Sequence, residues 1–342
     1  ERMGDLPHAL CDLARFIPER TLNDGSESGQ VALLGAFAGS EGKAVIKVAP
    51  APLPGDAADR ICSKELSLTP RAPYSGAEYG YYHGTVPPTL WSPLSVDILH
   101  PWSIPALSEE QREKLLAKHV SRSQQQEVLL FRETPEAYAA AHAAYIASIP
   151  PAATSWVYKI LSLEKEKERM LHNDEHFLMN VDAKWSSHPD CASERASWMN
   201  HASTRQLYCL ALTHRRDLRS LRDLRAADVP LLRHIRDTAL VALSDTYGAN
   251  PAQIRAFFHY PPQFYHLHVH FTHVSVDMPG VNTERAVLLD DVIDSLERDG
   301  DHFVRCALTC RVGAADDLWR RFEAWDKENG EEKTGSKRAR LS

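Results

Sequence analysis

Three histidines alternate with apolar residues in the segment His266-Leu267-His268-Val269-His270. On a β-strand, successive side chains point to opposite faces, so the three imidazoles share one face while Leu267 and Val269 enter the core on the other. Such a row could bind zinc or copper, could hold phosphate as a cationic shelf, or could present one histidine as a nucleophile. An exposed polar strand is the structural alternative, but three alternating imidazoles are rare there. Phosphate chemistry is therefore the favoured interpretation.

The composition limits what else the protein can do. The chain has 342 residues, of which 43% are hydrophobic and 25% charged, a mixture that excludes global disorder. With 39 Lys and Arg against 46 Asp and Glu, the formal net charge is −7. A general basic surface for long nucleic acid is therefore disfavoured, because that binding mode needs many cations to neutralise phosphates. A phosphate-rich ligand must therefore bind at a confined site with its own cationic or donor groups, rather than along a basic surface.

The cysteines and termini indicate a compartment. None of the six cysteines forms a CxxC pair, and free thiols are expected: Cys11, Cys62, Cys191, Cys209, Cys306 and Cys310. No apolar run approaches the roughly 18 residues of a membrane helix, and the start of the chain has no signal-peptide pattern. We therefore expect a soluble cytoplasmic protein without a membrane partner. The basic run Lys337-Arg338-Ala339-Arg340 could direct nuclear entry, although a solvated disordered end is its structural alternative.

The pattern of turns and apolar runs predicts two domains and a tail. Residues 31–37 and 44–48 read as a hairpin, and the Pro-rich and aromatic stretch 50–105 as an irregular β-rich module. Ser108-Glu109-Glu110-Gln111 is a helix-start signature. We expect a β-rich domain over 1–113, a larger domain over 114–330 and a basic disordered tail over 331–342.

The larger domain is expected to have an α+β fold. Helical spacing covers 154–168, a segment from Asp228 with Pro in its first turn, 283–298 and 316–325. Strands are predicted at 207–212, 256–260, 265–271 and 303–312. This order of strands and helices favours one sheet with helices packed against it.

Several motifs together resemble one known family. The segment from His266 to His270 looks like the histidine triad (HIT) motif, in which the central histidine attacks phosphorus. Further motifs combine with it to resemble the scavenger mRNA-decapping enzyme family from about Trp156 to Trp325: Trp156-Val157-Tyr158-Lys159-Ile160-Leu161, Asp182-Ala183-Lys184-Trp185, His214-Arg215-Arg216, Arg219-Ser220-Leu221-Arg222-Asp223-Leu224 and His259-Tyr260. The stretch from Tyr79 to Pro88 agrees with that family's first domain.

The resemblance implies a metal-independent hydrolase of short capped RNA remnants or of the cap dinucleotide. It would cut the triphosphate bridge and release 7-methylguanosine monophosphate. It also implies a HIT-type C-terminal domain with an antiparallel sheet, and a homodimer that exchanges its N-terminal domains. In that family His268 would be the nucleophile, His270 and His259 would contact the phosphates, and His266 would hold the site geometry.

The resemblance also implies cap-binding residues. Trp156 would stack on the cationic methylated guanine, Glu166 would accept from the guanine edge, and Lys184 would meet a phosphate. Asp182 is expected in the cap site, and Lys118 near the phosphates. A core Trp and a solvated Glu are the structural alternatives. Four positions depart from the family pattern and affect cap affinity and phosphate contacts: Gly76, Ala183, Gln263 and Phe264.

Two further functions stay open at this point. Another HIT-type enzyme, such as a dinucleoside polyphosphate hydrolase, would use the same histidines, but the pair Trp156 and Glu166 and the large first domain disfavour it. A non-catalytic cap-binding paralogue would fit the departures at Ala183, Gln263 and Phe264, whereas the four intact histidines favour activity.

Overall fold

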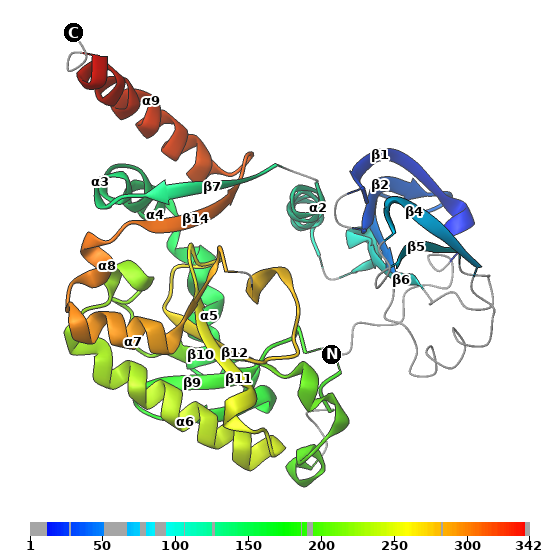
Figure 1. Cartoon of the computed structure of the whole chain (residues 1–342). Coiled ribbons are helices and arrows are strands. Elements are labelled where there is room, and N and C mark those ends of the chain that lie inside the picture. Colours follow the sequence, from blue (N-terminus) through cyan, green and yellow to red (C-terminus); the bar gives the residue numbers. More distant parts are fainter. Residues whose placement is uncertain are drawn as a thin grey trace. The chain divides into compact units, whose positions relative to one another are not determined.

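The computed structural model describes residues 12–26, 29–50, 67–75, 80–85, 94–105, 107–124, 127–185, 187–189, 194–281 and 283–338. The chain divides into two compact units, Glu1–Gln125 and Gln126–Ser342 (Figure 1). The boundary expected after residue 113 falls inside helix α2 (Glu109–Ser123), all of which belongs to the first unit.

The first unit is built on antiparallel strands. A four-stranded sheet has the order β1-β2-β3-β6, with bounds Phe16–Asp24, Val31–Phe37, Ala44–Pro50 and Leu94–Leu99. The hairpin expected from 31–37 and 44–48 is confirmed as β2 and β3. Strands β4 (Ser67–Ser75) and β5 (Gly80–Thr85) form a separate pair. Helix α2 begins with the capping box of Ser108 and Gln111 and packs Leu116 and Val120 on this unit's core.

The second unit contains a six-stranded sheet with the order β13-β11-β12-β10-β9-β8. All described pairings within it are antiparallel, so the α+β expectation is confirmed. The strand bounds are Ala286–Leu288 (β13), Ile254–His259 (β11), His268–His273 (β12), Tyr208–Thr213 (β10), Phe177–Val181 (β9) and Met170–Asn173 (β8). Strand β12 is central and every one of its residues is buried.

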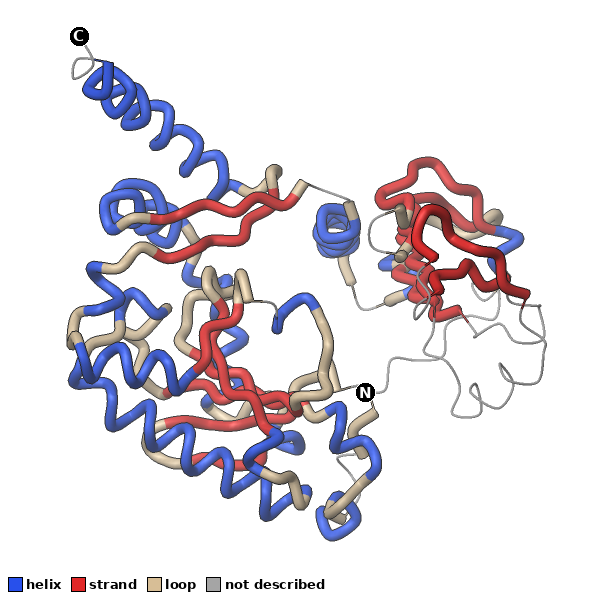
Figure 2. Tube along the Cα trace, viewed as in Figure 1, coloured by secondary structure: helices blue, strands red, loops and turns tan. Residues whose placement is uncertain are grey.

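Helices cover both faces of this sheet, as Figure 2 shows in blue around the red strands. Helices α6 (Val229–Tyr247) and α7 (Leu289–Arg298) bury their apolar stripes on the face that carries Leu267, Val269 and Phe271. Helix α5 (Ser155–Leu161) packs on the opposite face against Leu178, Leu210 and Leu212. Each face of the sheet therefore has its own apolar cluster.

A second layer completes this unit. Strands β7 (Val128–Glu133) and β14 (Leu308–Gly313) pair with each other, and α9 (Asp317–Arg338) stacks Phe322 on Phe131 of β7 with ring centroids 4.2 Å apart. Short helices connect the layers: α3 (Pro135–Ala137), α4 (Ala143–Ser148) and α8 (His302–Arg305).

Several predicted elements have different bounds. The helix expected over 154–168 ends at Leu161, and Leu163 and Glu166 then adopt positive φ angles, which an α-helix does not allow. The segment 283–298 begins with strand β13 before α7, and 303–312 begins in α8 before β14. Helix α9 runs to Arg338 and so includes most of the expected disordered tail, while 339–342 lie outside the described residues.

The structure tests two other expectations only for the described residues. Cys209, Cys306 and Cys310 are free thiols, and the other three cysteines lie outside the described residues. Among the helices that the structure describes, none combines the length and the apolar character needed to cross a membrane.

A buried ionic network joins the second layer to the six-stranded sheet. The Glu133 carboxylate, fully buried at the end of β7, accepts from Arg222 Nη2 at 2.6 Å and from Tyr260 Oη, and contacts His142 Nδ1 at 2.5 Å. Burial alone would raise the pKa of Glu133, but His142, Tyr260 and Arg222 hold it below its ordinary value. Because every charge has a partner, the network stabilises the contact between layers without leaving a buried group unpaired.

Removing the central carboxylate tests this role. Glu133→Ala leaves Arg222 buried without its counter-ion, so we expect the free energy of unfolding to fall by about 3–5 kcal/mol in urea titrations. Glu297→Ala removes the acid of the exposed pair with Arg233 and is expected to cost at most about 1 kcal/mol. Equal losses in the two variants would contradict the structural role of Glu133.

Candidate active site on the central strand

The predicted alternation places the histidines on one face of β12. Leu267 and Val269 lie in the core beneath α6 and α7, and His268 and His270 face the side covered by α5. His259, at the end of β11, lies beside them, with its ring centroid 4.0 Å from that of His270. The rings of His268 and His270 are 4.9 Å apart. The structure therefore brings three of the four predicted catalytic histidines into one cluster.

His268 has one nitrogen fixed and one nitrogen without a partner. Its Nδ1 donates to the backbone carbonyl of His266 at 2.7 Å, and a carbonyl can only accept, so Nδ1 carries the hydrogen. Its Nε2 is buried and has no hydrogen-bond partner within the described part of the chain. Burial lowers the pKa of His268 to about 3, so the imidazole is neutral near pH 7. Nε2 therefore presents an unprotonated lone pair, as a nucleophile requires.

His270 has the opposite arrangement. Lys184 Nζ donates to Tyr208 Oη at 3.1 Å, and Tyr208 Oη lies 3.0 Å from His270 Nδ1. The ammonium group only donates, so the Tyr208 hydroxyl is free to donate its own hydrogen to Nδ1, an arrangement that places the hydrogen of the neutral His270 ring on Nε2. Among the residues that the structure describes, this Nε2 has no partner, and it can donate to a ligand oxygen beside His268.

His259 and His266 hydrogen-bond the backbone. His259 Nε2 donates to Gly280 O and His266 Nε2 donates to Thr213 O, each at 2.7 Å. Burial, followed by the charge of Arg285, lowers the pKa of His259 to about 4. Its Nδ1 is buried without a partner, whereas His266 lies next to Tyr158 rather than in the cluster of free nitrogens.

Cations surround this cluster. Lys184 follows β9, and the Asp182 carboxylate accepts from its backbone N–H at 2.8 Å, which fixes the turn that carries the lysine. Desolvation lowers the pKa of the Lys184 ammonium group. Arg285 precedes β13, whose Ala286 pairs with His259, and its Nε is buried without a partner. Neutral imidazoles between two cations make a site suited to an anionic ligand.

Aromatic side chains join Trp156 to His268. The Phe264 ring stacks on the imidazole of His268, with centroids 4.0 Å apart and planes inclined by 11°. Trp156 meets Phe264 edge to face at 4.8 Å, and 38% of Trp156 is exposed. Trp156 is therefore accessible rather than a core residue, and only the Phe264 ring lies between it and His268.

The remaining predicted residues are not brought into the cluster. Glu166 is exposed and adopts a left-handed conformation with φ of 58°, and no hydrogen bond of its carboxylate is found in the part of the chain that the structure describes. Gln263 is exposed in the loop before β12. Lys118 lies on α2, and both its side chain and Gly76 lie outside what is described.

Two residues of the cluster were missed from sequence. Tyr208 could have been found, because it shares a strand face with Leu210 and Leu212 two and four residues later. Arg285 gives no local signal, since it depends on a long loop that returns to His259.

A possible metal site lies elsewhere. Within the described residues, Glu133, His142 and Cys310 bring three possible ligand atoms within 4.8 Å of one another. The Arg222 guanidinium, however, already occupies the Glu133 carboxylate, and its charge opposes a divalent cation there. These three residues therefore fit the structural network better than a metal.

Comparisons with known proteins agree with this geometry. The family model described as "Scavenger mRNA decapping enzyme C-term binding" matches residues 155–286, which contain the whole cluster. The m7GpppX diphosphatase of Bos taurus is 32% identical over 260 residues, covering 75% of this chain and 67% of the relative. The chain therefore belongs to the scavenger mRNA decapping enzyme family.

Other relatives carry the same name over a shorter stretch. The m7GpppX diphosphatases of Ascaris suum and Caenorhabditis elegans are 39% and 35% identical over 209 and 214 residues. These matches cover 60% and 61% of this chain, but only 64% and 63% of those relatives, slightly less than two thirds of their length.

The depressed histidine pKa values make stability depend on pH. Between pH 6.5 and about 4 the unfolded chain protonates His268 and the folded chain does not, so stability falls as the pH falls through this window. We expect His268→Gln to reduce the slope of unfolding free energy against pH by up to about 1.4 kcal/mol per unit.

Urea unfolding at several pH values measures this slope. The wild-type protein, unfolded under the same conditions, gives the reference slope. A slope in His268→Gln equal to that of the wild type would show that His268 is not held neutral by burial.

Proposed function

We propose that this protein hydrolyses the triphosphate bridge of the cap dinucleotide and of short 7-methylguanosine-capped RNA remnants, and releases 7-methylguanosine monophosphate. The carrying observation is the pair of free nitrogens in one cluster: the unprotonated Nε2 of His268 next to the N–H of His270. Family membership and the names of the relatives support the choice of substrate.

The proposed reaction has two displacements. His268 Nε2 attacks the phosphorus nearest the methylated nucleoside and forms an N–P bond, while the bond to the bridging oxygen breaks and the diphosphate leaves with its electron pair. Water then attacks the same phosphorus, the N–P bond breaks, and the lone pair returns to Nε2. His270 and Lys184 would balance the charge on the phosphoryl oxygens, and Arg285 would add a further cation.

Cap recognition is proposed for the accessible Trp156. N7-methylation makes guanine cationic, so stacking on an indole gains cation–π attraction. Glu166 and Asp182 are proposed to contact the cap nucleoside. Ala183 is small and exposed, so the second side of the base would be covered less tightly than a bulkier residue would cover it. Glu166 would have to turn toward the base on binding.

We further propose the HIT-type assignment of the catalytic domain, a homodimer that exchanges N-terminal domains, Lys118 and Gln263 as phosphate contacts, and a cytoplasmic location with nuclear entry. The two other functions differ in testable ways. A dinucleoside polyphosphate hydrolase would cut unmethylated GpppG as fast as the methylated cap. A non-catalytic paralogue would bind the cap and release no product.

Substitution of the nucleophile tests the chemistry. His268→Asn is expected to abolish release of 7-methylguanosine monophosphate from a capped dinucleotide and to leave binding measurable, because the phosphate and base contacts remain. The products are resolved by chromatography of a labelled cap, with GpppG as the control substrate. Full turnover by the variant would disprove the covalent mechanism, and equal rates on both substrates would disprove cap specificity.

Metal removal tests the source of charge balance. Treatment with EDTA is expected to leave the rate unchanged, because Lys184 and Arg285 supply the positive charge and the His270 N–H supplies a donor. Rates before and after chelation, and after zinc is added back, provide the measurement. A loss of activity that zinc restores would replace this mechanism with a metal-dependent one.

A further inference from the structure

Polar side chains continue along the catalytic face beyond the histidines. Thr272 lies two residues after His270 on β12, and its cross-strand partners are Arg255 on β11 and Tyr208 on β10. Strand alternation therefore places Arg255, Thr272 and Tyr208 on the same face as the histidines. Thr272 is fully buried and its Oγ1 has no partner. Buried groups without partners are rare, and neither the proposed nucleophile nor the cap site accounts for this one.

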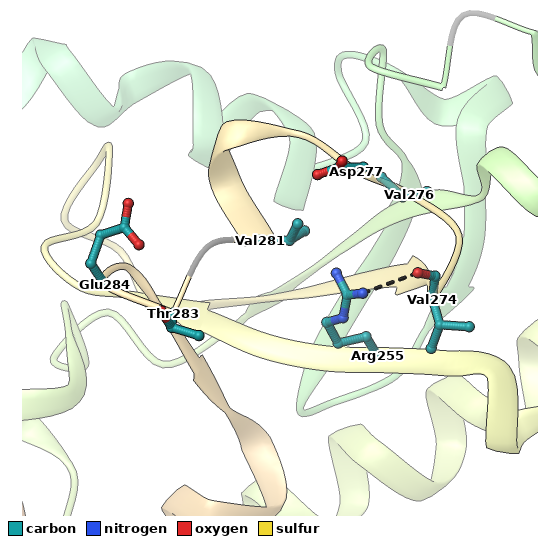
Figure 3. A pocket seen from close by; sticks show the side chains of 7 residues that line it. All are labelled: Arg255, Val274, Val276, Asp277, Val281, Thr283 and Glu284. Atoms are coloured by element: carbon teal, nitrogen blue, oxygen red, sulfur yellow. Dashed lines mark hydrogen bonds between the residues drawn. The ribbon is translucent and has the colours of Figure 1, made fainter. Parts of the chain in front are cut away.

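Arg255 lines a hollow at this end of the face. The hollow has a volume of about 440 Å³, and Figure 3 shows the guanidinium group of Arg255 pointing toward the loop that carries Asp277 and Val281. Arg255 Nη2 donates to the carbonyl of Val274 at 3.1 Å, and Nη1 is buried without a partner. The hollow is lined by Arg255, Val274, Val276, Asp277, Val281, Thr283 and Glu284.

One loop joins the hollow to the catalytic cluster. The segment 276–284 supplies five of the seven lining residues and also Gly280, whose carbonyl accepts from His259. Thr272 lies four positions after His268, which corresponds to about 13 Å along a strand. A ligand whose reacting phosphorus lies at His268 would have to pass His270 to reach the hollow. Only a ligand that continues beyond the cleaved triphosphate bridge is long enough to do so.

The lining suits a nucleotide rather than a free polyphosphate. Arg255 offers a planar cation for a phosphodiester oxygen, and the valines offer apolar surface to a ribose or base. Asp277 is exposed and would repel additional phosphates but can accept from ribose hydroxyl groups. Glu284 pairs with Arg311 at 3.3 Å, so its charge is already balanced.

We propose that this hollow binds the RNA body on the leaving side of the cap, with Arg255 contacting the first phosphodiester after the triphosphate bridge. This inference rests on the proposed decapping function. It predicts a sharp distinction between substrates, because a cap dinucleotide has no phosphodiester to reach Arg255, whereas a capped tetranucleotide has one.

The test compares substrate lengths in the full chain. For a capped tetranucleotide, Arg255→Gln is expected to raise KM at least about tenfold, the equivalent of one lost charge-assisted hydrogen bond, with kcat little changed. For the cap dinucleotide, KM should stay within about twofold of wild type. Arg255→Lys should recover part of the loss. Arg298→Gln, on the outer side of α7, is the matched control and should affect neither substrate.

The outcomes separate this inference from the proposed function. Equal effects on both substrates, or no effect on the tetranucleotide, would overturn the role of Arg255. If wild-type protein cut neither substrate, the proposed function would fail, and the hollow would be tested by binding a 5′-diphosphorylated tetranucleotide against GDP. Tighter binding of the tetranucleotide that Arg255→Gln abolishes would support the hollow, and equal binding would overturn it.

A second variant covers a failure of Arg255→Gln to fold. Val281→Glu places a negative charge on the loop above Arg255 without removing a backbone contact of β11. This variant is expected to raise KM for the capped tetranucleotide at least about tenfold, because the new carboxylate repels the phosphodiester. KM for the cap dinucleotide is expected to stay unchanged. An unchanged tetranucleotide KM would contradict RNA in the hollow.

Discussion

The hydrogen bond from His268 Nδ1 to the carbonyl of His266 determines which nitrogen of the central histidine is available for chemistry. It needs a carbonyl two residues earlier on the same chain, so it depends on the local path of the backbone into β12. That path is held because Leu267, Val269 and Phe271 are buried beneath α6 and α7. Packing on one face of the sheet thus fixes the proton position on the other face.

Burial and charge act together on this face. Desolvation keeps His259, His268 and His270 neutral; the charge of Lys184 further opposes protonation of all three, and that of Arg285 opposes protonation of His259 and His270. The same two cations favour an anion in front of the histidines. The arrangement therefore keeps Nε2 of His268 free of a proton under the conditions that attract phosphate, which a solvent-exposed histidine with its ordinary pKa would not achieve.

Sequence patterns predicted this site to the extent that it is local. Alternation over 266–270 was enough to assign the two faces, and the capping box of Ser108 and Gln111 marked the start of α2. The electrostatic effect of Arg285 on His259 and the contact of Phe264 with Trp156 depend on loops and a helix that only tertiary packing brings together. The helix expected to reach Glu166 stops at Leu161, because packing and positive φ angles in the following turn override helical spacing.

Two sets of buried polar side chains in the second unit, the Glu133 network and the histidine face of the sheet, show how structural and ligand-binding roles differ physically. In the Glu133 network the carboxylate, guanidinium, imidazole and hydroxyl groups satisfy one another, so burial costs little and no ligand is needed. On the catalytic face, atoms of His259, His268, His270, Thr272 and Asn180 are buried without partners. Each such atom costs about 1–3 kcal/mol, which a ligand can recover by supplying the missing partners. Buried polar atoms without partners, more than charge or burial alone, therefore indicate where a substrate binds. Such atoms lie beyond the histidines in both directions across the sheet.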